Sequence, residues 1–184
     1  MPPNVPATLL HFSENPSIVR FEPRLHPHHP DKPACVWAID DEHAPAYYFP
    51  RDCPRVLVWG TPTSTPEDVA RFLGHTQAKW VAAIEGAWLE RMRTAELFAY
   101  RFPAETFEPL DDAWMYLSRK TVTPLGVEPV GDLFARLRDR NIELRITPSL
   151  WPLWNAVIAS TLHFSGIRLR NAAPPPADLK VTPL

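Results

Sequence analysis

Proline constrains this chain more than any other feature: it occupies 23 of the 184 positions, more than twice the ordinary share of about 5%. The prolines stand mostly between stretches of periodic hydrophobicity. Each one fixes φ and lowers the entropy of the unfolded chain, so prolines in loops stiffen the connections between elements. Because 45% of the residues are apolar and seven are tryptophan, the sequence predicts a compact protein with rigid loops and excludes general disorder.

Length and charge limit the organisation and the partners. A chain of 184 residues fits one domain, which we expect over residues 8–171, between an extended segment at 1–7 and a Pro-rich tail at 172–184. The net charge of −2 without a basic stripe predicts no nucleic-acid partner. No apolar run reaches about 18 residues, so we expect no membrane span. Two cysteines, Cys35 and Cys53, form no disulfide framework and favour a cytoplasmic location.

The order of expected elements indicates an α+β fold with a central mixed sheet flanked by helices, because strands and helices do not alternate strictly. Strands are expected at 8–12, 35–39, 55–59, 79–85, 96–102, 114–122 and 142–146, and residues 125–130 are expected to pair with 114–122 across Pro124. Helices are expected at 41–48, from Thr65 to Gly74, at 87–94, from Asp132, and from Ser149 to about Leu162. The cap residues Thr65 and Asp132 and the glycine at 74 are typical helix boundaries.

The stretch 34–59 is the strongest indication of a site. It is expected to hold a buried strand, a short helix rich in polar and aromatic groups, and a second buried strand. A core alone does not need this density of Asp, His, Tyr and Arg, whereas a ligand pocket does. Tyr47 and Tyr48 point about 100° apart on a helix, so at least one of them can face a cleft and stack on a ring.

His11 and Arg51 are two candidates for direct contact with a ligand. His11 ends the first expected strand, where it could bind a ligand, transfer protons, or bond a neighbouring carbonyl. Arg51 lies in a turn bounded by Pro50 and Pro54. A guanidinium in a rigid turn suits phosphate or carboxylate recognition, and the alternative is a local surface pair with Asp52.

Metal and thiol chemistry are less favoured. His26, His28 and His29 form a loop cluster without a carboxylate or thiolate at ligand spacing, so we interpret them as a solvated loop and predict no metal site. His43 with Asp40, Asp41 and Glu42 could be an acid–base pair, a metal site or a capped helix start with a charged outer face. Cys53 carries no sign of activation and is interpreted as a structural thiol. The phosphate-loop, dinucleotide, nucleophile-elbow and zinc-protease motifs are absent from the sequence.

Two families resemble this sequence. Residues 9–13 (LLHFS), 18–23, 36–38 (VWA) and 44–48 (APAYY) resemble the front half of ADP-ribosyltransferase-like domains. Those domains commonly open with an apolar strand that ends in His and place an Ala- and Tyr-bearing helix after their second strand. Over nearly the whole length, the chain also resembles an uncharacterised bacterial family without an assigned activity, through residues 49–56 (FPRDCPRV) and 164–171 (FSGIRLRN).

The first resemblance implies a nucleotide site that uses NAD. It implies that His11 binds the ribose and that Tyr47 or Tyr48 stacks on the nicotinamide. The catalytic Glu of that family is expected near 116–122, where this chain has Ser118, Arg119 and Lys120. This departure is compatible with nucleotide binding without group transfer.

We therefore expect a nucleotide or another phosphorylated or sugar-containing small molecule to bind in one cleft, and we leave enzymatic activity open. The expected catalytic residues are His11, Tyr48 and Arg51, and the expected ligand-binding residues are Ser13, Arg24, Trp37, Tyr47 and Arg119. The alternative is a structural or protein-interaction domain, in which Trp-rich helices form a partner face and residues 41–52 form a hydrogen-bonded brace.

Overall fold

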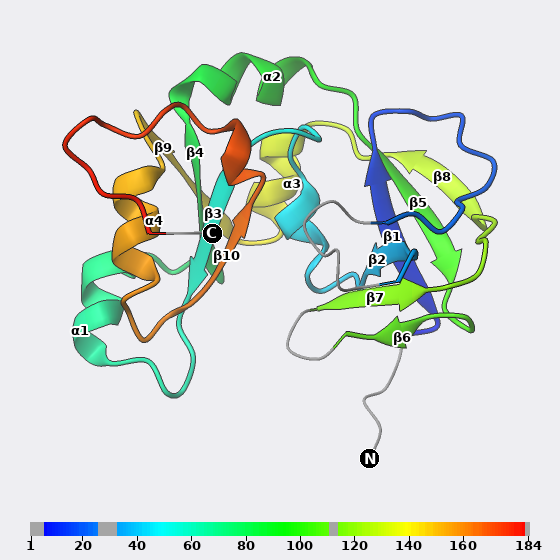
Figure 1. The fold of residues 1–184 in the computed structure, drawn as a ribbon, viewed down its shortest axis with the longest axis horizontal. Coiled ribbons are helices and arrows are strands. Elements are labelled where there is room, and N and C mark those ends of the chain that lie inside the picture. Colours follow the sequence, from blue (N-terminus) through cyan, green and yellow to red (C-terminus); the bar gives the residue numbers. More distant parts are fainter. Residues whose placement is uncertain (1–5, 26–32, 111–113, 183–184) are drawn as a thin grey trace. The chain divides into compact units, whose positions relative to one another are not determined.

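The chain folds into two compact units, each built from two stretches of sequence. The structure, a computed structural model, describes residues 6–25, 33–110 and 114–182. The first unit combines Met1–Arg51 with Glu96–Gly131, and the second combines Asp52–Ala95 with Asp132–Leu184. The expected domain over 8–171 thus contains parts of both units. The α+β class is confirmed, but each unit has its own sheet instead of sharing a central one (Figure 1).

The first unit contains an antiparallel six-stranded sheet in the order β6-β7-β2-β1-β5-β8. Its strands are β1 (Thr8–Ser13), β2 (Val36–Ile39), β5 (Phe98–Pro103), β6 (Glu108–Pro109), β7 (Met115–Ser118) and β8 (Gly126–Pro129). The helix expected at 41–48 is a short 3-10 helix, η1 (Ala44–Tyr47). The predicted pairing of 125–130 with 114–122 is wrong, because β8 pairs with β5. β7 ends at Ser118, whose hydroxyl oxygen accepts from the Lys120 N–H, and the chain turns away there.

One face of this sheet carries the core of the first unit, and residues 14–24 pack against it. The core residues are Leu9, Val36, Ala38, Tyr100, Phe102, Ala104, Phe107 and Val122. The Tyr100 hydroxyl donates to the Asn15 carbonyl oxygen at 2.6 Å and accepts from the Ile18 N–H at 3.0 Å. The Phe21 ring contacts the Phe102 ring at 4.8 Å. These contacts hold the loop after β1 on the core face.

The second unit contains a mixed four-stranded sheet in the order β10-β3-β4-β9, in which β4 and β9 are parallel. Its strands are β3 (Arg55–Trp59), β4 (Trp80–Glu85), β9 (Ile142–Thr147) and β10 (His163–Ile167). β3 and β4 are the inner strands, as their unbroken apolar runs predict. The sequence prediction missed β10, because it extended the last helix to about Leu162 and placed 163–165 at its end.

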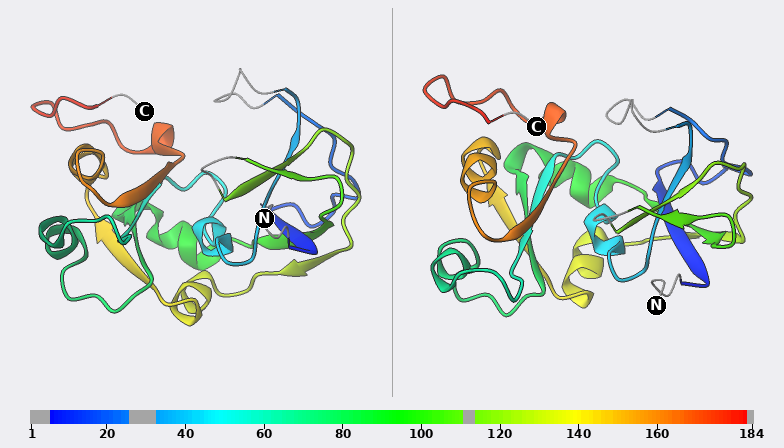
Figure 2. Two further views of the ribbon diagram at one scale, coloured as in Figure 1. Left: turned by 90° about the horizontal axis from the view of Figure 1, so that it is seen from below. Right: turned by 60° about the horizontal axis from the view of Figure 1, so that its bottom comes forward.

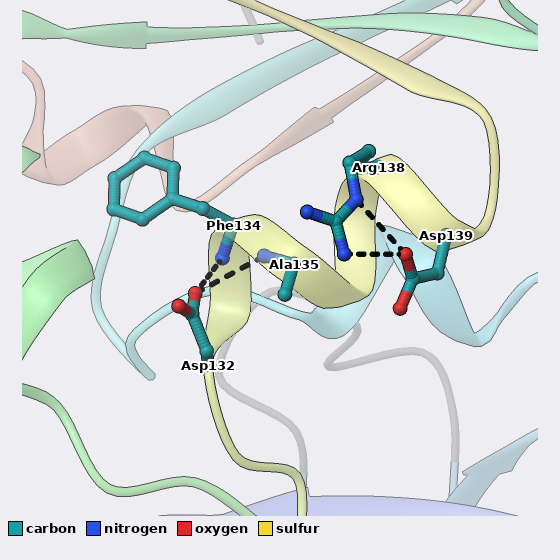
Figure 3. Close-up of polar contacts among 5 residues, drawn as sticks. All are labelled: Asp132, Phe134, Ala135, Arg138 and Asp139. Atoms are coloured by element: carbon teal, nitrogen blue, oxygen red, sulfur yellow. Dashed lines mark hydrogen bonds and ion pairs between the residues drawn. The ribbon is translucent and has the colours of Figure 1, made fainter.

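The described part of the second unit also contains short helices: α1 (Pro66–Asp68), η2 (Val69–Leu73), η3 (Gly86–Trp88), α2 (Leu89–Thr94), α3 (Leu133–Asp139), α4 (Trp151–Val157) and η4 (Leu169–Asn171). The caps predicted at Thr65 and Asp132 are confirmed, but α4, expected to begin at a Ser149 cap, has Leu150 at its N-cap. The Thr65 hydroxyl accepts from the Asp68 N–H, and Asp132 accepts from the N–H groups of Phe134 and Ala135 at 2.9 and 3.0 Å (Figure 3). Gly74, at a positive φ of 62°, ends η2 in a conformation that suits glycine.

The core of the second unit packs α4 against β3 and β10. It comprises Val56, Val58, Phe72, Ala83, Leu150, Trp151, Trp154, Val157, Leu162 and Leu169. Trp151 and Trp154 are buried, as expected for the apolar face of that helix. Of the helices in the described part of the chain, none has the length and apolar character needed to cross a membrane.

Candidate functional site

The sheet of the first unit opens between β1 and β2. Six residue pairs join β1 to β5, whereas only Leu10 and Ile39 pair between β1 and β2. Beyond that pair, Nδ1 of His11 lies 2.9 Å from the Trp37 carbonyl oxygen. Immediately before β2, the backbone of Cys35 bonds to the backbone of Arg24 at 3.1 Å in both directions. An imidazole therefore takes the place of a ladder hydrogen bond at the opening.

This contact determines the tautomer of His11. A carbonyl oxygen can only accept, so Nδ1 carries the proton and Nε2 of the neutral ring is an acceptor. No residue that the structure describes bonds to Nε2. Burial lowers the pKa of His11; the bond to the Trp37 carbonyl acts in the opposite direction, and the charge of Arg51 lowers the pKa further. His11 is thus neutral at pH 7, between the rings of Phe21 at 4.9 Å and Phe102 at 5.9 Å.

The predicted arginines differ from the other arginines of this unit. Arg20 pairs with Glu22 at 2.6 Å and Arg101 with Glu128 at 4.0 Å. Three others are exposed, and within the described residues their guanidinium groups have no acidic partner: Arg24, Arg51 and Arg119. The expected alternative pair of Arg51 with Asp52 is therefore not formed. Unpaired guanidinium groups are available for an external anion.

Two of these arginines flank Cys35, and the third lies near the end of β1. Arg24 bonds to the backbone of Cys35 on one side. On the other side, Val36 pairs with Ser118, the residue before Arg119. The backbone N–H of Arg51 donates to the Glu14 carboxylate at 3.0 Å. Glu14 follows Ser13, which is buried and accepts from the Asn15 N–H at 3.1 Å.

The aromatic candidates form a separate group. Tyr47 stacks parallel to Phe12 at 6.3 Å, and Tyr48 meets the same ring edge-on at 5.6 Å. The Tyr47 hydroxyl donates to Sδ of Met115 at 3.5 Å. Successive residues of a strand point to opposite faces, so the rings of Phe12 and His11 lie on opposite faces of β1.

Trp37 belongs to the aromatic side as well. It lies two residues from Ile39, which pairs with Met115, so the half-buried Trp37 ring shares the face of Met115. The eight predicted residues thus lie in three separate places. His11, Ser13 and Arg51 lie around the end of β1, Arg24 and Arg119 flank Cys35, and the Trp37, Tyr47 and Tyr48 side chains occupy the other face. The structure does not bring all eight into one hollow.

A shallow hollow of about 110 Å³ on the first unit contains none of the predicted residues. It is lined by Leu10, Ala99, Arg101, Gly126 and Glu128. Among the residues that the structure describes, no three His, Cys, Asp or Glu side chains gather as metal ligands. The loop histidines His26, His28 and His29 lie outside the described residues.

A second titratable group lies after β2. Nδ1 of His43 is 2.7 Å from an Asp40 carboxylate oxygen, which also accepts the His43 backbone N–H at 2.8 Å. The His43 ring stacks on Trp114 at 4.4 Å with an interplanar angle of 5°. Burial, and then the charge of Asp40, raise the pKa of Tyr116. The Asp-x-x-His spacing signalled this contact, whereas the stacking on Trp114 comes from a distant segment and had no local signal.

Buried polar groups in the second unit are structural. Burial raises the pKa of the Cys53 thiol to about 12; the charge of Arg55 opposes this change and that of Glu85 adds to it. Such a thiol is inert as a nucleophile, in agreement with its interpretation as structural. Arg55, 2% exposed, donates to the Cys53 carbonyl oxygen at 2.8 Å.

Acidification is expected to destabilise the protein through His11. Because the folded-state pKa lies below the unfolded value of about 6.5, the unfolded chain binds the proton more readily, and stability falls as the pH drops below about 6.5. The slope from this one group is at most about 1.4 kcal/mol per pH unit. Urea unfolding between pH 7.5 and 5 should show a smaller loss in His11→Gln. The exposed His75→Gln control should match the wild type; equal pH dependence in all three proteins would contradict the assignment.

The fold and this site define an α+β protein of two units, whose first unit holds a neutral histidine where two strands separate. The chain belongs to a family of unknown function (DUF6886), whose model matches residues 10–172. The resemblance to an uncharacterised family is thus confirmed. No curated protein and no solved structure matches the chain, so the resemblance to ADP-ribosyltransferase-like domains stays an expectation from the sequence.

Proposed function

We propose that the first unit binds a small molecule in which a hydroxyl-bearing ring lies beside an anionic group, as in a nucleotide or a sugar phosphate. The observation that carries this proposal is the neutral His11, whose Nε2 can accept a hydrogen bond close to the charge of Arg51. A half-buried neutral imidazole suits a hydroxyl donor better than an anion, because it carries no charge. The exposed guanidinium of Arg51 suits phosphate, which it can bind through two parallel hydrogen bonds.

The other predicted residues support this proposal to different degrees. Ser13 supports the end of β1, and Arg24 and Arg119 add positive charge beside Cys35. Contacts of Trp37, Tyr47 and Tyr48 with the ligand stay predictions, since their rings lie on the face opposite His11. NAD is included among the ligands to be tested, because the sequence resemblance implies it. The proposal is limited to binding and includes no transfer step.

Ligand binding should raise the melting temperature of the full chain. A ligand at a hundred times its Kd stabilises the folded state by about 2.7 kcal/mol. We would test NAD, ADP-ribose, ADP and ribose 5-phosphate by thermal shift. Arg51→Ala should weaken binding about tenfold or more, because a hydrogen bond to a charged group contributes about 1.5–3 kcal/mol. His11→Gln should weaken binding to the hydroxyl-bearing probes as well.

Arg20→Ala is the matched control, because Arg20 is exposed and paired with Glu22. It should bind as the wild type does. Arg51 is also exposed, so its substitution leaves the fold intact and a lost shift reports on binding. A flat response to all probes at millimolar concentration would overturn the proposal and favour a structural or protein-interaction role.

We also propose a cytoplasmic location for the protein. Both cysteines are buried, and neither is joined in a disulfide. Free thiols in a folded protein persist in reducing compartments.

A further inference from the structure

Residues 173–182 return to α4 (Figures 1 and 2), and their backbone forms hydrogen bonds there. We call residues 173–182 the C-terminal arm. At its start, the Ala173 N–H donates to Glu85 at 2.8 Å and the Ala173 carbonyl oxygen accepts from Nε1 of Trp151 at 2.6 Å. Both backbone groups of one residue are thus bonded to the second unit.

At the far end of the arm, Asn155 bonds to the backbone as a neighbouring strand would. Its amide nitrogen donates to the Lys180 carbonyl oxygen at 2.6 Å, and its amide oxygen accepts from the Thr182 N–H at 2.9 Å. Nε1 of Trp154 donates to the Thr182 carbonyl oxygen at 3.3 Å. An extended segment of any sequence can present this pair of backbone groups two residues apart.

Two side chains add sequence preference to this backbone recognition. Leu179 and Val181 are half-buried and pack against the apolar cluster of the second unit. They lie on either side of Lys180, whose carbonyl oxygen Asn155 binds. The face of α4 therefore fits an extended segment with apolar side chains at alternate positions.

Among the residues that the structure describes, none outside the arm forms a hydrogen bond with the five residues between the two anchored ends. Residues 174–178 are exposed, and the Leu179 N–H donates to the Pro176 carbonyl oxygen at 2.9 Å within the arm. Three of them are consecutive prolines, Pro174, Pro175 and Pro176, which lack an N–H and favour extended backbone. A stiff, unanchored connection can direct the arm away from its own α4 at small cost.

We propose that α4 binds the arm of a second copy of this chain as well as its own, so that two copies exchange arms. The contacts are identical in both cases, since Asn155 and Trp154 bind backbone groups that every copy carries. Exchange of an identical element is a low-cost route to a dimer. The cis arm competes at an effective concentration of the order of millimolar, so the exchanged form increases with protein concentration.

Two full-length variants test the exchange by complementation. Asn155→Asp keeps its arm, but it replaces the amide donor with an oxygen that faces the Lys180 carbonyl oxygen. Leu179→Asp with Val181→Asp keeps α4, but it removes the apolar anchors of the arm. Each variant should sediment as a monomer alone, and an equal mixture should contain a heterodimer, because the intact arm of the first docks on the intact α4 of the second.

A chain that carries all three substitutions is the control and should stay monomeric in every mixture. A labelled peptide of residues 173–182 should also bind the arm variant and bind the triple variant at least tenfold more weakly. The proposal is overturned if the mixture sediments as its two components do, whether or not the peptide binds. Unchanged melting of Asn155→Asp would show that the variant is folded, so that a missing heterodimer counts against exchange.

Discussion

Replacing Glu85 with alanine is expected to lower the free energy of unfolding by about 3–5 kcal/mol, because each hydrogen bond to a charged group contributes about 1.5–3 kcal/mol. Glu85 is 3% exposed at the end of β4. Its two carboxylate oxygens accept from the backbone N–H groups of Leu150 at 3.2 Å and Ala173 at 2.8 Å. Alanine leaves the buried Leu150 N–H without an acceptor and removes the acceptor of the Ala173 N–H. The side chain thus joins β4, the start of α4 and the C-terminal arm.

Urea unfolding would measure this effect against two other substitutions. Glu90→Ala on α2 removes an exposed carboxylate that lies 3.7 Å from Arg93, and it should change stability by less than about 0.5 kcal/mol. Glu85→Gln keeps the shape and one acceptor, so it should fall between the two. A loss below about 1 kcal/mol for Glu85→Ala would show that the two backbone groups find other partners.

The sequence could not predict the role of Glu85, because its partners lie 65 and 88 positions away along the chain. Local features were predicted better. Thr65 and Asp132 cap helices because their side chains bond to N–H groups two or three residues ahead, which sequence spacing expresses directly. The class of the fold can be predicted from such local elements. The pairing between distant strands cannot be predicted from them.

Two of the differences between the expected and the observed sheets have this origin. Residues 125–130 follow 114–122 closely, and this short separation favours a hairpin, but β8 pairs with β5 instead. β10 is five residues long and contains Gly166, and a glycine inside a strand weakens the pattern that identifies it. Its antiparallel pairing with β3 joins segments about a hundred residues apart.

The candidate site was predicted in part for the same reason. Strand ends and rigid turns can be recognised from sequence, so His11 and Arg51 were identified, and the structure adds the neutral tautomer of His11. The face on which a side chain lies depends on register. Tyr47 and Tyr48 follow β2, and their contacts with Phe12 place their rings on the face of the sheet opposite His11. The sequence pattern of a short helix does not show which face of the sheet its side chains contact.

Gly166→Ala is expected to cost about 1–3 kcal/mol, the range for an extra methylene in a packed core. A Cβ at Gly166 would lie 2.5 Å from Cζ3 of Trp154 and 2.8 Å from Cδ1 of Leu169. The Trp154 ring cannot move freely, because it meets Phe164 edge-on at 5.6 Å and its Nε1 donates to the Thr182 carbonyl oxygen. A displaced ring therefore also weakens the hold of α4 on the C-terminal arm.

Gly60→Ala is the matched control for this substitution. A Cβ there would contact side chains of Leu73 and Val69 at 3.7 and 3.8 Å, which is ordinary van der Waals distance, so its stability should stay within about 0.5 kcal/mol of the wild type. Urea unfolding measures the loss in Gly166→Ala, and susceptibility to proteolysis after Lys180 measures release of the arm. If Gly166→Ala unfolded at the same urea concentration as Gly60→Ala, the Trp154 ring would be able to move aside without a loss of stability. The predicted clash between β10 and α4 would then be wrong.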